Sequence, residues 1–577
     1  MAKELMIGNE AVARGLYEGG LRVASSYPGT PSTEITECIS TYDDIYSEWA
    51  PNEKVAAEVA LGAAIAGARS FCGMKHVGLN VASEAIFTGS YTGVNAGWVL
   101  AVADDPGMHS SQNEQDSRHY AKASKVMMLE PSDSAECLEF AKKAFELSEK
   151  FDCPVILRLT TRVAHSRSLV EKGERNDIGV KEYVKNPQKY VMMPAMAKGR
   201  HVVVEQRIID QTNWAESCEF NRVEMNDTKI GVIASGVCYQ YAKEALGKNA
   251  SYLKLGCVYP MPVELIKDFA SKCDKVYVLE ELDPFIEEHC KTNGIEVIGK
   301  DAFSLQGEYS QSLIAKTILG VEAESVGADL EIPGRPPVLC AGCPHRGLFY
   351  ALKKQKVTVS GDIGCYTLGA LAPLGMIDTC ICMGASVSAL HGRNKADASN
   401  EKKSVAVIGD STFIHSGVTG LIDIAYNASN STVIILDNSI TGMTGHQQNP
   451  TTGKTIKGDP ATAVDLEALA KAVGINRVRV VDPYNLKETE TAIKEELAAE
   501  EPSVIISRRP CALLKYVKHE PSLKVNADKC RGCTACMKIG CPAISFRDKK
   551  AVIDFTQCIG CGVCQQLCAF DAIEKGE

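Results

Sequence analysis

The feature that most restricts the fold of this chain is a set of eight cysteines near its C-terminal end. The first four are Cys530, Cys533, Cys536 and Cys541, and the second four are Cys558, Cys561, Cys564 and Cys568. Three cysteines at two-residue gaps can wrap one face of a cubane cluster, while the more distant fourth binds the other cluster. The spacing therefore predicts two 4Fe-4S clusters, with Cys568 completing the Cys530 cluster and Cys541 completing the Cys558 cluster.

Zinc is the alternative metal for paired Cys-x2-Cys motifs. Three cysteines at successive two-residue gaps supply more ligands than a tetrahedral zinc site uses in one loop. The segment resembles bacterial-type two-cluster ferredoxins, with two departures: four residues rather than three precede Cys541, and Ala569 stands in place of the usual proline. Neither departure removes a ligand, so we expect an electron-transfer module at 516–577.

The bulk composition indicates a large globular protein. The 577 residues are 45% hydrophobic and 23% charged, which allows about three to five domains. The net charge of −10 has no long run of either sign behind it, so nucleic acid and anionic membranes are unlikely partners. The N-terminus is polar and no apolar run reaches the ~18 residues of a spanning helix, so we expect a cytoplasmic protein.

Alternating helix and strand patterns predict an α/β fold with several domains. Helical spacing is found at 10–18, from about 32, and at 53–69, and strand-like runs are found at 21–27, 77–81, 99–103, 154–159, 229–235 and 275–279. The predicted domains are 1–190, 229–332, 333–515 and 516–577. The polar, irregular stretch at 191–228 is predicted to be a connector.

A β-α-β unit in the third of these domains carries candidate magnesium ligands. A strand at 404–408 leads into Gly409-Asp410-Ser411, a helix follows at 416–427, and a strand at 432–436 leads into Asp437-Asn438. Right-handed crossovers place neighbouring strand ends side by side, so Asp410 and Asn438 can reach one ion. Magnesium prefers such oxygen ligands and shares them with phosphate. The alternative role for Asp410 is a helix N-cap.

This arrangement resembles the diphosphate-binding motif of thiamine-dependent enzymes, with Ser411 where many members have glycine. The resemblance implies that the side chains of Asp410 and Asn438 and the carbonyl of Ile440 bind Mg²⁺, and that Gly409 and Ser411 lie beside the diphosphate. It implies a thiamine diphosphate-binding domain at 333–515.

Three further segments resemble 2-oxoacid:ferredoxin oxidoreductases: 340–346 (CAGCPHR), 361–365 (GDIGC) and 442–447 (GMTGHQ). The resemblance places Cys343, Gly364, Cys365, Gly442, Met443 and Thr444 at the cofactor. His345 would lie near the diphosphate or the substrate, although a structural histidine is almost as good an interpretation. Cys340 and Cys343 could form half of a metal site, but no second cysteine–histidine pair with suitable spacing accompanies them.

The N-terminal domain is expected to supply the second half of the thiamine site. Thiamine enzymes use a glutamate at N1′ of the aminopyrimidine, and the resemblance gives this role to Glu53, with Glu58 as the reserve candidate. Without the resemblance, Glu53 would be an acidic residue favoured in a helix's first turn. Thr30, in a loop that resembles the family's substrate loop, would hydrogen-bond the 2-oxoacid or the cofactor. His109 and Gln112 are pocket candidates, with a surface loop as the equal alternative.

Across its whole length the chain resembles the α subunits of indolepyruvate:ferredoxin oxidoreductases, in which the domains follow this order: pyrimidine-binding, transketolase C-terminal-like, diphosphate-binding and ferredoxin. The resemblance implies oxidative decarboxylation of arylpyruvates (indolepyruvate, phenylpyruvate) with coenzyme A to an arylacetyl-CoA and CO2. Electrons would pass through the clusters to ferredoxin. It also implies a smaller β subunit, an α2β2 assembly and half-sites that meet across a subunit interface.

Three other functions stay open. The substrate could be pyruvate or a branched-chain 2-oxoacid. The chain could be a non-oxidative decarboxylase with a vestigial tail, which the eight retained cysteines disfavour. It could be an electron-transfer subunit with an inactive thiamine site, which the intact Asp410, Asn438 and Glu53 disfavour.

Overall fold

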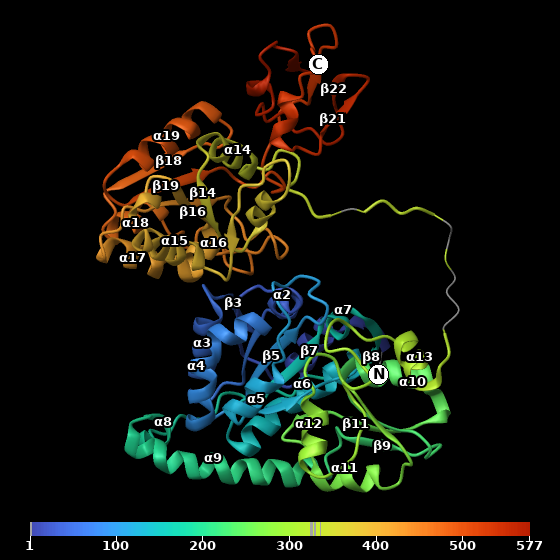
Figure 1. Ribbon diagram of the computed structural model, residues 1–577. Coiled ribbons are helices and arrows are strands. Elements are labelled where there is room, and N and C mark those ends of the chain that lie inside the picture. The colour runs from blue at the N-terminus through green and yellow to red at the C-terminus, as the bar shows by residue number, and fades with distance from the viewer. Residues whose placement is uncertain (1–2, 323–326, 328–329, 335, 577) are drawn as a thin grey trace. The chain divides into compact units, whose positions relative to one another are not determined.

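A computed structural model describes residues 3–322, 327, 330–334 and 336–576 (Figure 1). The chain divides into two compact units, Met1–Asp329 and Leu330–Glu577. Each contains a predominantly parallel sheet covered by helices, as predicted for an α/β fold.

The first unit is built on a seven-stranded sheet. In sheet order the strands are β12 (Cys257–Tyr259), β6 (Met127–Leu129), β7 (Val155–Thr160), β5 (Trp98–Asp104), β4 (Ser70–Lys75), β2 (Val23–Ser26) and β3 (Tyr46–Trp49). All neighbours are parallel except β12 and β6. Because parallel strands end at one edge, the loops after β2, β3, β4 and β5 gather there.

Helices pack in two layers against this sheet, as expected for strands buried on both faces. One hydrophobic core holds α1 (Gly8–Glu18), α2 (Thr33–Ser40), α6 (Ser134–Phe151) and α7 (Thr161–His165). The other holds α3 (Glu53–Ile65), α4 (His76–Thr92) and α5 (Arg118–Ser124). A short antiparallel pair, β1 (Lys3–Ile7) and β8 (Arg167–Glu171), lies beside the first layer.

A smaller sheet completes the first unit. Its order is β13 (Val276–Leu279), β10 (Gly231–Ser235), β11 (Ser251–Leu255) and β9 (Arg222–Glu224). Its helices are α10 (Gly236–Leu246), η1 (Gly247–Asn249), α11 (Val263–Ala270), α12 (Phe285–Thr292) and α13 (Gln311–Leu319). The following strand β12 leaves this sheet to pair with β6, so one hydrophobic core runs through both sheets.

One sequence prediction in the first unit is wrong. Residues 77–81 are not a strand: they belong to α4, whose small and apolar residues resemble either kind of buried element. The stretch predicted to be a connector contains α9 (Pro194–Ala215), a 22-residue helix that follows α8 (Pro187–Tyr190) (Figure 1). Arg207 anchors α9 by donating hydrogen bonds to Ser90 and Asp152, and such polar anchoring produces no apolar stripe for a sequence pattern to show.

The second unit contains a six-stranded, fully parallel sheet. Its order is β15 (Thr379–Cys380), β14 (Thr358–Gly361), β16 (Ser404–Gly409), β17 (Thr432–Asp437), β19 (Ser503–Arg508) and β18 (Arg477–Val481). One core holds α14 (His345–Gln355), η2 (Cys365–Ala370) and α19 (Leu486–Ala498). The other holds α15 (Ala385–Ala396), η4 (Phe413–Gly417), α17 (Val418–Tyr426) and α18 (Leu466–Ala472); α16 (Asp410–Thr412) precedes η4, and η3 (Ala398–Asn400) follows α15.

The C-terminal module of this unit has little regular structure. It comprises the antiparallel pairs β20 (Leu523–Val525) with β23 (Ile573–Lys575) and β21 (Ile544–Arg547) with β22 (Lys550–Ile553), and the turns η5 (Ala535–Ile539) and η6 (Gln565–Leu567). Cysteines form much of its small core, together with Leu486 of α19. In the described part of the chain, no helix combines the length and apolar character that crossing a membrane requires.

Candidate active site

The candidate magnesium ligands lie at the carboxyl edge of the six-stranded sheet. Strands β16 and β17 are adjacent and in register, with Gly409 opposite Leu436, so the residues that follow them emerge side by side. Asp410 is 2% exposed, Asn438 is 8% exposed and Ile440 is 3% exposed. A carboxylate, an amide and a backbone carbonyl are the oxygen ligands that Mg²⁺ prefers.

The electrostatics of this edge favour a bound cation. Burial raises the pKa of Asp410 to about 8, and the nearby carboxylate of Asp437 adds to the increase. Asp437 accepts a hydrogen bond from Arg508 Nε at 2.8 Å. A divalent cation would relieve the repulsion between two buried carboxylates. Asp410 does not cap a helix, because α16 begins at Asp410 itself and Gly409 is the cap residue.

The loop after β17 closes over this edge. Thr441 pairs with Gln447 in an isolated bridge, and Thr444 Oγ1 donates a hydrogen bond to Gln447 Oε1 at 2.6 Å. Gly442 lies where a Cβ would be 3.4 Å from Cys365 Sγ and 3.9 Å from Asn438 Nδ2. Met443 is half-exposed. The loop therefore brings backbone close to the candidate magnesium ligands and to Ser411, whose amide donates a hydrogen bond to Asp410 Oδ1.

Tyr366 fixes the floor of this half-site. Its hydroxyl donates a hydrogen bond to the carbonyl of Ile363 at 2.8 Å. A Cβ at Gly364 or Gly409 would lie 2.3 Å or 2.7 Å from its ring, so both positions require glycine. His345 packs edge-to-face on the same ring, and burial lowers its pKa to about 4, which keeps its imidazole neutral.

Four cysteines from three separate loops meet next to this half-site. We call Cys340, Cys343, Cys365 and Cys511 the loop group. Burial raises the pKa of Cys365 to about 11 and that of Cys343 to about 12, and other cysteines of the loop group add to both increases. The amide of Cys511 donates a hydrogen bond to the carbonyl of Asn438 at 2.9 Å. The loop group is thus tied directly to a candidate magnesium ligand.

The sequence pattern did not reveal this group, because its other members do not form a second cysteine–histidine pair of short spacing. Cys365 and Cys511 instead join Cys340 and Cys343 from far along the chain. The signal that could have found them is their position: Cys365 follows the end of β14 and Cys511 follows the end of β19. These two strands end at the same edge of one parallel sheet, with β16 and β17 between them.

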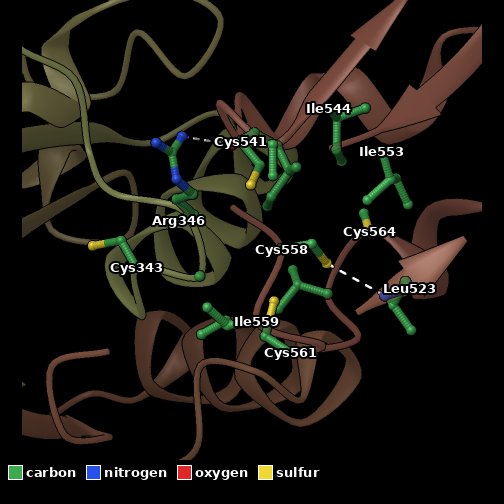
Figure 2. A pocket seen from close by; sticks show the side chains of 14 residues that line it. Cys343, Arg346, Leu523, Cys541, Ile544, Ile553, Cys558, Ile559, Cys561 and Cys564 are labelled. Atoms are coloured by element: carbon green, nitrogen blue, oxygen red, sulfur yellow. Dashed lines mark hydrogen bonds between the residues drawn. The ribbon is translucent and has the colours of Figure 1, made fainter. Parts of the chain in front are cut away.

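The eight C-terminal cysteines separate into two groups around two cavities. The inner module group, Cys541, Cys558, Cys561 and Cys564, lines a cavity that also contains Gly342, Cys343 and Arg346 (Figure 2). The outer module group, Cys530, Cys533, Cys536 and Cys568, lines a second cavity, in which Cys533 is exposed. Each cavity combines three closely spaced cysteines with the fourth from the other run, the arrangement predicted from the spacing.

The spacing of the sulfur atoms is wider than a single metal ion requires. A tetrahedral zinc with Zn–S bonds of about 2.3 Å holds its sulfurs about 4 Å apart. Among the described residues, no three cysteine sulfurs lie within 4.8 Å of one another. No three of the described cysteines are therefore arranged as a single tetrahedral zinc would hold them.

In the first unit, Glu53 and Thr30 lie at the carboxyl edge of the seven-stranded sheet. Glu53 is the first residue of α3 and is 3% exposed, and Asn52 caps that helix through Val55. Glu58, on the same helix, is half-exposed and pairs with Lys54. Thr30 follows β2 and is partly buried. Burial distinguishes Glu53 from its reserve candidate.

Two residues that the sequence analysis did not single out lie at the same edge. Burial lowers the pKa of Lys75, whose ammonium feels the charges of Asp105 and Glu53. His76 is 1% exposed, and within the described structure its ring nitrogens have no hydrogen-bond partner. Lys75 is the last residue of β4 and His76 is the first residue of α4, and the wrong prediction of a strand at 77–81 concealed this strand end.

The candidates His109 and Gln112 are both exposed. His109 Nε2 lies 2.9 Å from Glu308 Oε2, and the side chain of Arg162 holds the same carboxylate. Within the first unit these are the contacts of a surface loop, and the pocket role of His109 and Gln112 stays a prediction.

Comparison with known proteins agrees with this geometry. Residues 14–229 match the family described as pyruvate flavodoxin/ferredoxin oxidoreductase, thiamine diP-bdg, residues 362–507 match the C-terminal TPP-binding domain of thiamine pyrophosphate enzymes, and residues 522–569 match a 4Fe-4S dicluster domain. The chain is 42% identical to indolepyruvate oxidoreductase subunit IorA of Pyrococcus abyssi, over 99% of this chain and 96% of that protein. The chain belongs to the IorA family.

A second member of the IorA family, from Archaeoglobus fulgidus, is 41% identical over 100% of this chain and 98% of its own length. Among solved structures, a 2-oxoglutarate:ferredoxin oxidoreductase from Magnetococcus marinus is 19% identical, with a TM-score of 0.47 over 55% of this chain and 65% of that chain. The predicted family and the predicted α/β fold with a ferredoxin module are confirmed. This IorA-family chain is a thiamine-diphosphate-dependent 2-oxoacid oxidoreductase linked to iron–sulfur carriers.

Proposed function

We propose that the chain is the α subunit of an arylpyruvate:ferredoxin oxidoreductase. Its substrates would be indolepyruvate and phenylpyruvate, with coenzyme A as the acyl acceptor and ferredoxin as the electron acceptor. A smaller β subunit would complete an α2β2 enzyme in the cytoplasm. The names of the IorA relatives carry the choice of indolepyruvate. The domain boundaries 1–190, 229–332, 333–515 and 516–577 stay predictions.

The residues at the sheet edge of the second unit fit thiamine diphosphate and Mg²⁺. Asp410, Asn438 and the carbonyl of Ile440 would hold Mg²⁺, while Gly409 and Gly442 leave room for phosphate oxygens. When bound, thiamine diphosphate supplies the electron sink on which a 2-oxoacid loses CO2. The raised pKa of Asp410 near Asp437 is the observation that supports a cation at this position.

Glu53 would hydrogen-bond the aminopyrimidine N1′, and Thr30 would contact the 2-oxoacid or the cofactor. A nearly inaccessible carboxyl at a helix N-terminus can hold or release a proton at a defined position without exchange with bulk water. His345 stays neutral, so it can donate one hydrogen bond and accept another beside the diphosphate.

We also propose that the loop group holds an iron–sulfur cluster, in addition to one cluster on the inner and one on the outer module group. The amide of Cys511 contacts Asn438, and Cys343 lines the cavity of the inner module group. Electrons would therefore pass from the thiamine site to the loop group, then to the inner module group and the outer module group. Cys533 is exposed, which makes the outer group the exit to ferredoxin.

The experiment that tests the function uses the anaerobic complex with its β subunit. With thiamine diphosphate, Mg²⁺ and coenzyme A, we expect rapid ferredoxin reduction with indolepyruvate and at least tenfold lower kcat/KM with pyruvate, a difference of about 1.4 kcal/mol. Equal or faster turnover with pyruvate would overturn the substrate assignment. Release of an aldehyde without ferredoxin reduction would show a non-oxidative decarboxylase instead.

A further inference from the structure

A buried guanidinium lies between two of the three cysteine groups. Arg346 belongs to the first turn of α14 and is 5% exposed. Figure 2 shows its side chain beside Cys541, with Cys343 below it in the view, on the loop that precedes α14. Arg346 therefore lies next to members of both the loop group and the inner module group.

Backbone carbonyls from both sides hold this side chain. Arg346 Nε donates to the carbonyl of Cys340 at 3.0 Å, and Nη2 donates to that of Leu339. Nη1 donates to the carbonyl of Gly540 at 2.5 Å and to that of Ile539 at 3.3 Å. One guanidinium thus binds the backbone at 339–340, where the loop group begins, and the backbone at 539–540, just before Cys541. Such a planar fork has a fixed position, unlike the flexible ammonium of lysine.

The negative partners of this charge are cysteines. In the described structure no carboxylate forms an ion pair with Arg346. Burial lowers its pKa, and the groups that oppose this effect are Cys541 first, followed by Cys343, Cys340 and Cys561. Two of these belong to the loop group and two to the inner module group. A buried cation without a carboxylate is costly unless other negative charge compensates it.

Thiolate-ligated 4Fe-4S clusters supply such negative charge, and reduction adds one more negative charge to them. A nearby fixed cation favours the reduced form, because net charge and hydrogen bonds set cluster potentials. Arg346 itself lines the cavity of the inner module group, and its Nη1 donates to the carbonyl of Gly540, next to Cys541, so the effect should be larger for the inner module group than for the loop group.

We propose that Arg346 is a positioning residue for electron transfer: it raises the midpoint potential of the inner module cluster more than that of the loop-group cluster. One electron then moves from the loop group to the inner module group in the favourable direction. This inference rests on the proposed cluster sites, but it does not depend on which 2-oxoacid is the substrate.

The test is a redox titration of the anaerobic holoenzyme, followed by electron paramagnetic resonance, without any 2-oxoacid. In Arg346→Gln we expect the reduced-to-oxidised ratio of the inner module cluster at a fixed potential to fall at least tenfold, which is about 59 mV for one electron. The shift of the loop-group cluster should be smaller. Arg479→Gln removes an exposed arginine of β18 that pairs with Glu495, and it is the matched control with unchanged potentials.

Unchanged potentials in Arg346→Gln with full iron content would overturn the proposal, and so would an equal shift of every cluster.

If the glutamine variant loses iron, the Arg346→Lys variant tests the proposal instead. A buried lysine loses its proton more readily than arginine, so the inner-cluster potential should fall between pH 7 and pH 10 in Arg346→Lys, relative to the wild-type protein. The wild-type profile controls for Tyr484, His345, Arg509 and Asp482 nearby. A lysine variant that follows the wild-type profile at every pH would refute the electrostatic role.

Failure of the proposal about Arg346 can be distinguished from failure of the proposed function. If the loop group holds no iron in the wild-type protein, the proposed third cluster is wrong. The proposal about Arg346 is then wrong as well, because it compares the potentials of the loop-group cluster and the inner module cluster. If all clusters are present but indolepyruvate is not oxidised, the substrate assignment fails while the potential shift still tests Arg346.

Discussion

The carboxyl group of Glu53 lies against the backbone of Gly78: a Cβ added at Gly78 would be 2.6 Å from Glu53 Oε1 and 2.7 Å from Glu53 Cγ. The two residues occupy the first turns of α3 and α4, which both begin at the carboxyl edge of one sheet. Gly78 thus leaves the space that allows a nearly inaccessible glutamate at this position.

Replacing Glu53 by glutamine should lower kcat by about 100-fold or more, the usual contribution of a positioned acid or base. Steady-state ferredoxin reduction measures it, and calorimetry should show that thiamine diphosphate still binds. Glu58→Gln is the matched control, because Glu58 is half-exposed and pairs with Lys54. A larger loss in the Glu58 variant would transfer the role to that residue.

Gly78→Ala should reproduce part of the Glu53 defect without removing the carboxyl group. The new methyl group must displace Glu53 or shift α4, which costs about 1–3 kcal/mol. We expect a lower thermal midpoint and a reduced kcat. Gly62→Ala is the control, since its Cβ would meet nothing within 4 Å. Equal behaviour of the two alanine variants would contradict the importance of this contact.

Asp410→Ala should weaken thiamine diphosphate binding in the presence of Mg²⁺ by at least about 100-fold, because it removes a buried oxygen ligand. Iron content, measured in the same samples, should stay unchanged. Asp423→Ala, which removes an exposed carboxylate of α17, is the control. Full cofactor affinity in Asp410→Ala would refute the proposed magnesium site.

Cys365→Ser should reduce the iron content by about one third, from about twelve to about eight atoms per chain, if three 4Fe-4S clusters are present. Cys382→Ser changes an exposed cysteine outside the three groups and should leave the iron content unchanged. A wild-type content of about eight atoms, with no loss in Cys365→Ser, would limit the chain to the two module clusters.

A buried acid in the first unit predicts a pH dependence of stability. Burial raises the pKa of Glu281 to about 7 from its ordinary value near 4.5. Between these pH values the folded protein keeps a proton that the unfolded chain releases, so stability should fall as the pH rises from about 4.5 to about 7. Thermal melts of Glu281→Gln should show a weaker pH dependence and a higher midpoint at pH 8.

Glu288→Gln, at an exposed position of α12, is the control for this experiment. The amide oxygen of the Glu281→Gln variant can still accept the hydrogen bond that Tyr309 donates to Glu281. Identical pH profiles for the wild-type protein and the Glu281 variant would show that Glu281 does not control the stability in this range.

Local sequence patterns identified the elements that are short and uniformly apolar. Strands β16 and β17 are continuous apolar runs that end in Gly-Asp and Asp-Asn, so the proximity of Asp410 and Asn438 could be derived before any coordinates. The grouping of the C-terminal cysteines around two cavities also follows from spacing alone.

Other features depend on contacts that no local pattern contains. The loop group combines cysteines from three separate loops, and only the strand order brings Cys365 and Cys511 together with Cys340. Residues 77–81 carry apolar side chains in both a helical and a strand-like arrangement, so the choice of α4 depends on packing against α3 and the sheet. Helix α9 is held by Arg207 and Gln211, which are polar residues.

If the loop group holds a cluster, as proposed, it also determines the order in which this protein can mature. Cys340 and Cys343 leave the ribosome early in the second unit, whereas Cys511 follows β19, the last strand of the parallel sheet. Until that strand has been synthesised, the early cysteines have an incomplete set of partners. Insertion of iron and sulfide at this position therefore has to follow translation of the sheet, and a chain truncated before Cys511 should mature no cluster there, however much iron the cell supplies.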